Sequence, residues 1–377
     1  DVGGYRPGAL ARARSTRGAD AGLFRIEGAG RIAARSWRFA GSDSTALGER
    51  VERALAKRSA LLEGLRGEER ATTAFRLLHG EADGVPGLAV DLLEDELRLL
   101  LLGRAAEPLV EEVVATLAAR LPMDPAAVLV THLAERPKGE LRCVRPLRGR
   151  PRVEPFCVRE AGYAFEVENG LREPMVSRPG IGLFLDQRAN RARIARRIRE
   201  RGGGRWLNLF CHTGAFSVVA LGAGADRVVS VDLSRPYLET LERNLEHNRL
   251  DGARHECVRM DAVRFLERLG ASERFDGVVL DPPTAAAAGR RFWSARKLQS
   301  TLIARCLALL SPRGALLVCR NDRSARGELR ALVAREAARS RVELAELEEA
   351  GPAPDFPRLA GFREGDAFEG ALAIRRG

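Results

Sequence analysis

The stretch Trp206-Leu-Asn-Leu-Phe-Cys-His-Thr-Gly-Ala-Phe216 decides the fold of this chain. The apolar run from Trp206 to Phe210 predicts a short buried strand, and a polar turn ending at Gly214 leads into an apolar helical run over Ala215–Leu221. A strand, a glycine turn and a helix form the first half of a nucleotide-binding βαβ unit. Glycine lets a ligand approach the backbone, and the helix N-terminus offers unpaired N–H groups.

Acidic residues end three further predicted strands, Val228–Asp232, His255–Asp261 and Phe275–Asp281. Asp232 lies about 20 residues after the turn, where a carboxylate binds a ribose diol. Asp261 could accept a hydrogen bond from an adenine amine, and Asp281 is followed by Pro282-Pro-Thr284. Because parallel strands end at one edge of a sheet, we expect the three carboxylates to line one ligand-binding edge.

This order of elements resembles the class I S-adenosylmethionine-dependent methyltransferases. The resemblance implies a Rossmann-like α/β domain with a mostly parallel, doubly wound sheet. The three spaced glycines that cradle a dinucleotide pyrophosphate are missing, which argues against NAD. A generic α/β domain could carry one such aspartate by chance, but chance does not account for all three in this order with the double proline.

The composition favours a nucleic-acid partner. The chain has 377 residues, room for two or three domains, and a net charge of +11. Its 62 basic residues are nearly all arginine, whose planar guanidinium binds phosphate in a bidentate way and stacks on bases. A GC-rich genome would account for arginine over lysine, but not for the excess of basic over acidic residues.

The cysteines support neither a metal site nor a disulfide framework, because the six show no paired spacing. Reduced thiols are typical of the cytoplasm, where we expect the protein to reside. The sequence contains no apolar run that approaches a membrane span and no secretory signal.

The sequence predicts three parts. Residues 1–69 contain one strand, Gly30–Phe39, and one helix, Ser44–Arg66. Residues 70–169 form a small α+β domain that starts with the hairpin Arg76–Asp91, and residues 170–377 form the Rossmann-like domain. Alternation in the hairpin puts His79, Glu81 and Asp83 on one side, as in a metal or catalytic cluster. The turn formers around Gly84 and Pro86 favour a structural turn instead.

Several motifs in combination resemble the bacterial large-subunit 23S rRNA methyltransferases, over roughly residues 30 to 377. The hairpin motif His79–Gly87 is similar to the central domain of the branch that makes 5-methylcytosine. Gly182–Arg188 is similar to the segment before the catalytic core in that branch and in the N7-methylguanine branch. The core motifs are Asn208–Gly214, Val231–Ser234, the helix with Asn244 and Asn248, and Asp281–Thr284. The resemblance implies S-adenosylmethionine as cofactor, 23S rRNA as partner, and RNA binding by residues 70–169.

Two departures from the cytosine branch stand out. Only about 30 residues precede the strand that matches that branch, too few for the PUA RNA-binding domain with which it begins. We therefore expect that domain to be lost, truncated or degenerate, so that residues 1–69 are its remnant or a linker. The nucleophilic cysteine of that branch aligns with Asn321, and Cys319 lies two residues earlier. Thr284 and the stretch Arg320–Arg323 are closer to the guanine branch.

The chemistry separates the two bases. Carbon-5 of cytosine is a poor nucleophile and needs a thiolate that adds at carbon-6. Guanine N7 has a lone pair and needs mainly positioning. Because Leu316–Val318 is an apolar strand, we expect Cys319 to be a buried strand cysteine, and guanine N7 to be the target. The alternative is cytosine carbon-5 with Cys319 as nucleophile. The candidate catalytic residues are Asp281, Pro282, Thr284 and Asn321.

The resemblance also assigns the cofactor site. Asp232 would take the ribose hydroxyls, Asp261 the adenine amine, and the backbone of Phe210–Gly214 the methionine end, with Gln187 and Arg188 over its carboxylate. The candidate cofactor-binding residues are Gln187, Arg188, Asn208, Phe210, Thr213, Gly214, Asp232, Ser234, Asp261 and Asp281. Two alternatives remain open: an RNA-binding or ribosome-assembly protein with a relic methyltransferase fold, and a small-molecule methyltransferase. A homodimer is compatible with each of them.

Overall fold

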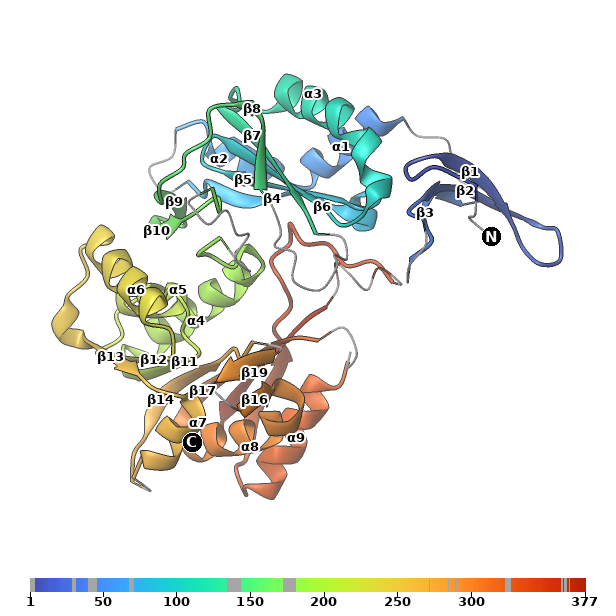
Figure 1. The fold of residues 1–377 in the computed structure, drawn as a ribbon. Helices are drawn as coiled ribbons and strands as arrows, with labels where there is room; N and C mark the ends of the chain where they lie inside the picture. The colour runs from blue at the N-terminus through green and yellow to red at the C-terminus, as the bar shows by residue number, and fades with distance from the viewer. Residues whose placement is uncertain are drawn as a thin grey trace. The chain divides into compact units, whose positions relative to one another are not determined.

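The computed structural model describes residues 4–28, 32–39, 46–67, 71–133, 144–171, 181–270, 272–283, 285–288, 291–322, 327–360, 362, 365 and 367–377. The chain forms two compact units, whose elements are labelled in Figure 1. The first unit contains Asp1–Gly162, Val167–Ile181 and Asp355–Gly365. The second contains Tyr163–Glu166, Gly182–Pro354 and Asp366–Gly377.

The first unit begins with an antiparallel sheet in the order β1-β2-β3. The prediction of one strand before the first helix was therefore wrong. The strand sequence LARAR does alternate apolar and charged residues, but Leu10 is the only large apolar side chain in it, so the strand signal is weak. The three strands are β1 (Leu10–Arg14), β2 (Asp20–Ile26) and β3 (Ala34–Phe39).

The helix expected over Ser44–Arg66 is two helices, α1 (Leu47–Ala56) and α2 (Ser59–Gly64). The break falls at Arg58, whose side chain is fully buried. Its guanidinium donates hydrogen bonds of 3.0 and 2.7 Å to the two carboxylate oxygens of Asp83. Burying this cation requires a matched anion, and the chain leaves the helix to provide that geometry.

A second sheet of the first unit has the order β4-β5-β6-β7-β8. Neighbouring strands are antiparallel except β6 and β7, which are parallel because a helical connection links them. The expected hairpin is present, and α1 and α3 cover one apolar face of the sheet. The elements are β4 (Ala74–His79), η1 (Gly80–Asp83), β5 (Leu88–Leu93), β6 (Glu96–Leu101), η2 (Arg104–Leu109), α3 (Val110–Arg120), β7 (Ala127–His132), β8 (Val144–Gly149) and β9 (Phe156–Glu160).

A strap from the far end of the chain, Asp355–Gly365, completes the first unit. The Asp355 carboxylate accepts a 2.8 Å hydrogen bond from the backbone N–H of Arg76. The His79 ring lies 2.7 Å from the carbonyl oxygen of Gly365 and packs edge-on against Phe356. The expected domain boundary at residue 170 assigned this segment to the Rossmann-like domain, whereas it packs in the first unit. His79 has a packing role, in agreement with the structural interpretation of the hairpin.

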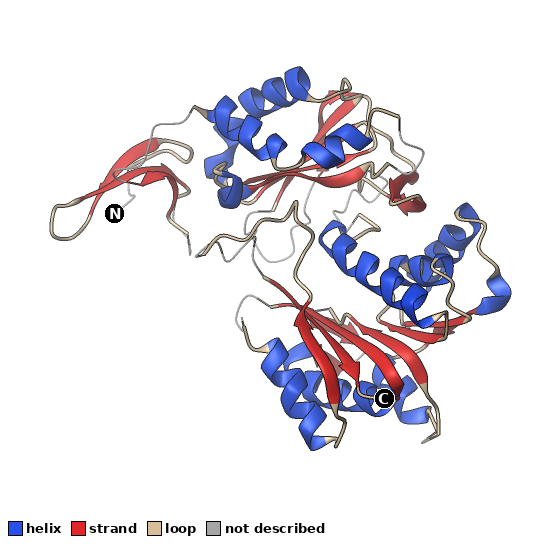
Figure 2. Ribbon diagram, turned by 180° about the vertical axis from the view of Figure 1, so that it is seen from behind, coloured by secondary structure: helices blue, strands red, loops and turns tan. Residues whose placement is uncertain are grey.

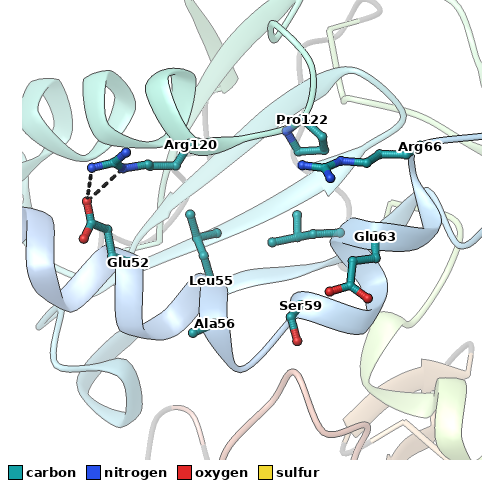
Figure 3. Close-up of a pocket in the computed structure, with 9 residues that line it drawn as sticks. Glu52, Leu55, Ala56, Ser59, Glu63, Arg66, Arg120 and Pro122 are labelled. Carbon is teal, nitrogen blue, oxygen red and sulfur yellow. Dashed lines mark hydrogen bonds and ion pairs between the residues drawn. The ribbon is translucent and has the colours of Figure 1, made fainter.

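A surface groove of about 530 Å³ lies between α1–α2 and the end of α3 in this unit (Figure 3). Leu55 lines it, and a 2.7 Å ion pair between Glu52 and Arg120 spans one end. Both charged side chains are about half exposed, so the pair contributes little to stability.

The sheet of the second unit has the order β13-β12-β11-β14-β17-β19-β18. The strands from β13 to β17 are parallel, and β19 is antiparallel to both of its neighbours. This confirms the expected class I, Rossmann-like α/β fold with a mostly parallel sheet. The strands are β11 (Arg205–Leu209), β12 (Arg227–Asp232), β13 (His255–Arg259), β14 (Phe275–Leu280), β17 (Leu310–Asn321), β18 (Leu344–Glu349) and β19 (Phe368–Arg375).

Helices cover both faces of this sheet, as Figure 2 shows. One core contains residues of α7, α8 and α9 packed on one sheet face, while α4, α5 and α6 lie on the other. The remaining elements are β10 (Tyr163–Val167), η3 (Leu185–Gln187), α4 (Arg188–Arg201), α5 (Ala215–Gly222), α6 (Arg235–His247), η4 (Gly252–Arg254), α7 (Ala262–Arg268), β15 (Ala285–Ala288), β16 (Arg291–Ser294), α8 (Ala295–Ala308) and α9 (Leu329–Arg339).

Candidate active site

The three predicted aspartates lie at one edge of the second unit's sheet. Asp232 is the last residue of β12, Asp281 directly follows β14, and Asp261 follows β13 as the N-cap of α7. Because these strands run parallel, their carboxyl ends meet at the same edge. Asn321, the last residue of β17, ends at this edge too and is exposed. The expected placement of the carboxylates is confirmed.

The turn between β11 and α5 has an unusual backbone. Phe210, His212 and Gly214 have φ angles of 57°, 51° and 77°, so left-handed residues alternate with ordinary ones. The N–H groups of this turn are largely engaged within the protein: Cys211 donates to the carbonyl of Val231, His212 to Asp232, and Gly214 to the carbonyl of Cys211. Only glycine fits at position 214, because a Cβ there would lie 2.2 Å from Leu241 Cγ.

Asp232 holds this turn through hydrogen bonds to its carboxylate. Oδ2 accepts a 2.9 Å bond from the N–H of His212, and Oδ1 accepts one of the same length from the N–H of Ser234. Burial raises the pKa of Asp232, and these backbone donors act in the opposite direction. The backbone of Leu233 also acts on this carboxylate, which has about four acceptor positions in all, so acceptor capacity remains for a hydroxyl group.

An uncharged aromatic cluster adjoins the turn, which sequence reasoning missed. The His212 ring packs against Phe184 and Tyr237 at centroid distances of 5.0 and 4.3 Å. Burial lowers the pKa of His212 to about 4, so the ring is neutral at pH 7. Phe184 is 41% exposed, and Leu233, next to Asp232, is 49% exposed. An aromatic residue inside the Gly182–Arg188 motif was the available signal.

Asp281 has a dedicated hydrogen-bond donor. Gln187 Nε2 donates to Asp281 Oδ2 at 2.8 Å, and the Gln187 side chain is buried. Burial raises the pKa of Asp281 to about 7, with a further upward contribution from Asp186, while Gln187 and Arg191 act in the opposite direction. Pro282 is buried beside it. Thr284 lies outside the described residues.

Cys319 is a buried thiol in β17. Its side chain is 0% exposed, and Sγ lies 3.7 Å from Gln187 Oε1, to which the thiol donates. Burial raises the pKa of Cys319 well above its usual range, and the Asp281 charge adds to this effect. A group in these surroundings is protonated at neutral pH.

Three of the predicted cofactor residues have side chains engaged in the protein. Asn208 is 4% exposed and donates to Ser217 Oγ at 2.8 Å; Thr213 is 3% exposed and donates to the carbonyl of Gly182. The Asp261 carboxylate caps α7 by accepting from the N–H of Arg264 at 3.1 Å. Direct contacts from these side chains to a cofactor stay predictions, and burial disfavours them for Asn208.

The other predicted cofactor residues are placed as follows. Gln187 contacts Asp281, and its expected role over a methionine carboxylate stays a prediction. Arg188 is the half-buried first residue of α4. The backbone of Phe210 and Gly214 forms part of the turn, and the backbone N–H of Ser234 donates to Asp232.

Asn190, which the sequence did not single out, is fully buried and contacts Gln187. Its i,i+3 spacing from Gln187 across the start of α4 was the available signal.

Comparison with known proteins identifies the family. A family model described as S-adenosylmethionine-dependent methyltransferase matches residues 76–365. The chain belongs to this family. A protein named ribosomal RNA large subunit methyltransferase I from Pseudoalteromonas translucida is 30% identical over 353 residues, covering 90% of this chain and 84% of the relative. The protein of the same name from Tolumonas auensis is 31% identical over 330 residues, covering 86% and 79%.

Solved structures show the same fold. A Streptococcus mutans protein described as a candidate SAM-dependent methyltransferase is 20% identical, with a TM-score of 0.77 over 98% of this chain and 92% of that one. A candidate methyltransferase solved in complex with SAH has a TM-score of 0.78 with the same identity and coverage. Among the described helices of this methyltransferase, none is both long and apolar enough to cross a membrane. The described residues also contain no group of three or more candidate metal ligands.

The cofactor of this methyltransferase is S-adenosylmethionine, and the site residues fit it. The Asp232 carboxylate is an acceptor of the kind that ribose hydroxyls need, while the expected contact of the Phe210–Gly214 backbone with the methionine end stays a prediction. Leu233 provides exposed apolar surface directly after that carboxylate, as a purine ring requires. When bound, the cofactor supplies a sulfonium methyl group that is open to nucleophilic attack.

Proposed function

We propose that this methyltransferase modifies a base of 23S ribosomal RNA, and that the target atom is guanine N7. The two relatives named above support a large-subunit rRNA substrate. The net charge of +11 supports a polyanionic partner. We further propose that residues 70–169 help to hold the RNA, because none of the candidate cofactor residues lies in this range.

The burial and raised pKa of Cys319 are the observations that favour guanine N7 over cytosine carbon-5. Cytosine carbon-5 becomes nucleophilic only after a thiolate adds to the ring, and such thiolates occur at partly exposed, electropositive positions. Cys319 is fully buried, and its pKa is raised by burial and by the neighbouring Asp281 charge. Guanine N7 needs no covalent activation, so a site of hydrogen-bonding groups is sufficient.

Asp281 and Asn321 are the groups that we assign to the target base. Asp281 follows β14 and Asn321 is the last residue of β17, two parallel strands that end at the same sheet edge, and both side chains could bind polar groups of a purine. Asp281 Oδ2 is occupied by Gln187, which leaves Oδ1 as the acceptor for a base N–H group. Pro282 keeps the backbone after Asp281 rigid, because its ring fixes φ. Their task is to orient the nucleophilic nitrogen in line with the methyl group.

The alternative base is cytosine carbon-5, which the likeness of the His79–Gly87 hairpin to the 5-methylcytosine branch favours. A deletion strain tests the proposal. We expect mass spectrometry of its 23S rRNA nucleosides to show the loss of one 7-methylguanosine, restored by the wild-type gene but not by an Asp281→Asn variant. Loss of a 5-methylcytidine would move the assignment to cytosine, and unchanged nucleosides would refute an rRNA substrate.

Cys319→Ala is expected to keep most of the methyl-transfer activity. The thiol is a weak donor to Gln187, and removing it creates only a small cavity in the strand. Transfer of labelled methyl groups to rRNA fragments measures the effect, with Cys306→Ala as a control cysteine that is equally buried in α8. Complete loss of activity, together with a covalent adduct to RNA containing 5-fluorocytosine, would instead identify Cys319 as a nucleophile.

A further inference from the structure

A chain of hydrogen bonds runs from α4 to Asp281. Arg193 Nη1 donates to Asn190 Oδ1 at 3.0 Å, and Asn190 Nδ2 donates to Gln187 Oε1 at 2.7 Å. Gln187 Nε2 then donates to Asp281 Oδ2 at 2.8 Å. Asn190 is 0% exposed and Gln187 is 3% exposed, so water does not compete for these bonds.

Arg193 sets the direction of this series of hydrogen bonds. A guanidinium can only donate, so it fixes the oxygen of the Asn190 amide toward itself and the nitrogen toward Gln187. A second contact of Asn190 Nδ2, 3.4 Å from the carbonyl oxygen of Ala350, agrees with this orientation. The Gln187 oxygen receives Asn190 and also the Cys319 thiol. The Gln187 nitrogen must therefore face Asp281.

We propose that Arg193, Asn190 and Gln187 are positioning residues that present Asp281 to the target base as a hydrogen-bond acceptor with Oδ1 free. A carboxylate whose Oδ2 accepts an N–H bond is favoured in its charged form, and the side chain is held in one rotamer. With the Gln187 amide reversed, a carbonyl oxygen would face Asp281 and favour the protonated acid. This inference rests on the proposed role of Asp281 in base binding, but its test does not.

The groups around Asp281 determine how strongly its ionisation is opposed. We call the hydrogen bonds from Arg193 through Asn190 and Gln187 the relay. Asp186, in η3 just before α4, repels a second negative charge, whereas Arg191 attracts it. Cys319, on β17, is a neutral thiol that contacts Gln187. Burial and Asp186 together oppose ionisation, so the hydrogen bond from Gln187 is a main local source of stabilisation for the carboxylate.

The titration of Asp281 itself provides the test. The protein is labelled with ¹³C at aspartate carboxyl carbons, and the Asp281 resonance is identified by its absence in Asp281→Asn. In Gln187→Met, which keeps the side-chain length but has no donor, we expect an upward pKa shift of about one unit, a tenfold change in proton affinity. Asn190→Leu should shift the pKa in the same direction by less, because Gln187 keeps its amide but loses its fixed orientation.

Ser217→Ala is the matched control, since Ser217 is a fully buried residue hydrogen-bonded to Asn208 and Ser230 and has no contact with Asp281. It should lose stability without moving the Asp281 titration. If Gln187→Met does not fold, Gln187→Glu replaces it, and its added carboxyl should raise the Asp281 pKa further. An unchanged titration in the folded Gln187 and Asn190 variants would overturn the relay. Absence of RNA methylation by the wild-type protein would instead refute the proposed function.

Discussion

Asp281→Asn is expected to reduce methyl transfer by about 100-fold and, at the same time, to stabilise the protein at pH 8. Activity falls because an amide cannot replace a charged acceptor for a base N–H group. The fold is preserved because the asparagine oxygen can still accept the 2.8 Å hydrogen bond from Gln187. Single-turnover methyl transfer to an rRNA fragment measures the first effect.

The stability gain follows from the direction of the pKa shift. The pKa of Asp281 is raised from 3.8 to about 7, so the folded chain holds this proton more tightly than the unfolded chain. The protonated Asp281 carboxyl makes its full contribution to the free energy of unfolding below about pH 4. This contribution is lost as the pH rises toward 7. Above pH 7 the ionised carboxylate costs roughly 2–4 kcal/mol, which asparagine removes.

Urea denaturation at pH 5 and pH 8 tests this linkage. The stability difference between Asp281→Asn and the wild type should grow between the two pH values. Asp276→Asn is the control, because Asp276 lies at the other end of β14, the strand that Asp281 follows, and accepts from the N–H of Arg205 at 2.8 Å. That variant should keep its activity and lose some stability. A difference for Asp281→Asn that is the same at both pH values would contradict the assignment.

Asp232→Ala is expected to weaken S-adenosylmethionine binding by about 100-fold, the second large effect. The variant loses the proposed acceptors for the ribose hydroxyls. It also leaves the N–H groups of His212 and Ser234 without their 2.9 Å partners, so the turn loses its fixed shape. Asp232→Asn should give an intermediate affinity, because only one of its two terminal groups can accept.

Titration calorimetry with S-adenosylmethionine measures these affinities. Asp251→Ala is the matched control, since Asp251 is an exposed aspartate of the same unit that caps η4 by accepting from the N–H of Ala253. Its affinity for the cofactor should match that of the wild type. Equal affinities for Asp232→Ala and the wild type would remove Asp232 from the cofactor site.

The sequence predicted the second unit better than the first. Several of its strands are apolar runs that are followed by turn residues. Because β12, β13 and β14 are parallel, the aspartates at or just after their carboxyl ends lie at one edge of the sheet. In the first unit, β1 is a short alternation of mostly small apolar residues and arginine, so its strand signal is weak. The break between α1 and α2 depends on the buried pair of Arg58 and Asp83, which are 25 positions apart in the sequence.

The same distinction applies within the site. Asp232 is recognisable because its spacing from the turn is local in the sequence. The partnership of Gln187 with Asp281 joins residues 94 positions apart, so no pattern in either segment reveals it. The aromatic packing of His212 between Phe184 and Tyr237 likewise depends on tertiary structure. Contacts of this kind decide the charge of a group, which a motif alone does not.

The strap Asp355–Gly365 affects how the protein is made. Asp355 accepts hydrogen bonds from the Arg58 side chain and from the backbone N–H of Arg76, 297 and 279 positions earlier in the sequence. On the ribosome, these early residues are synthesised long before their partner. The first unit therefore completes its buried polar cluster only after residues 355–365 have emerged, and expression of residues 1–162 alone would leave the hydrogen bonds of Arg58 and Arg76 to Asp355 unmade.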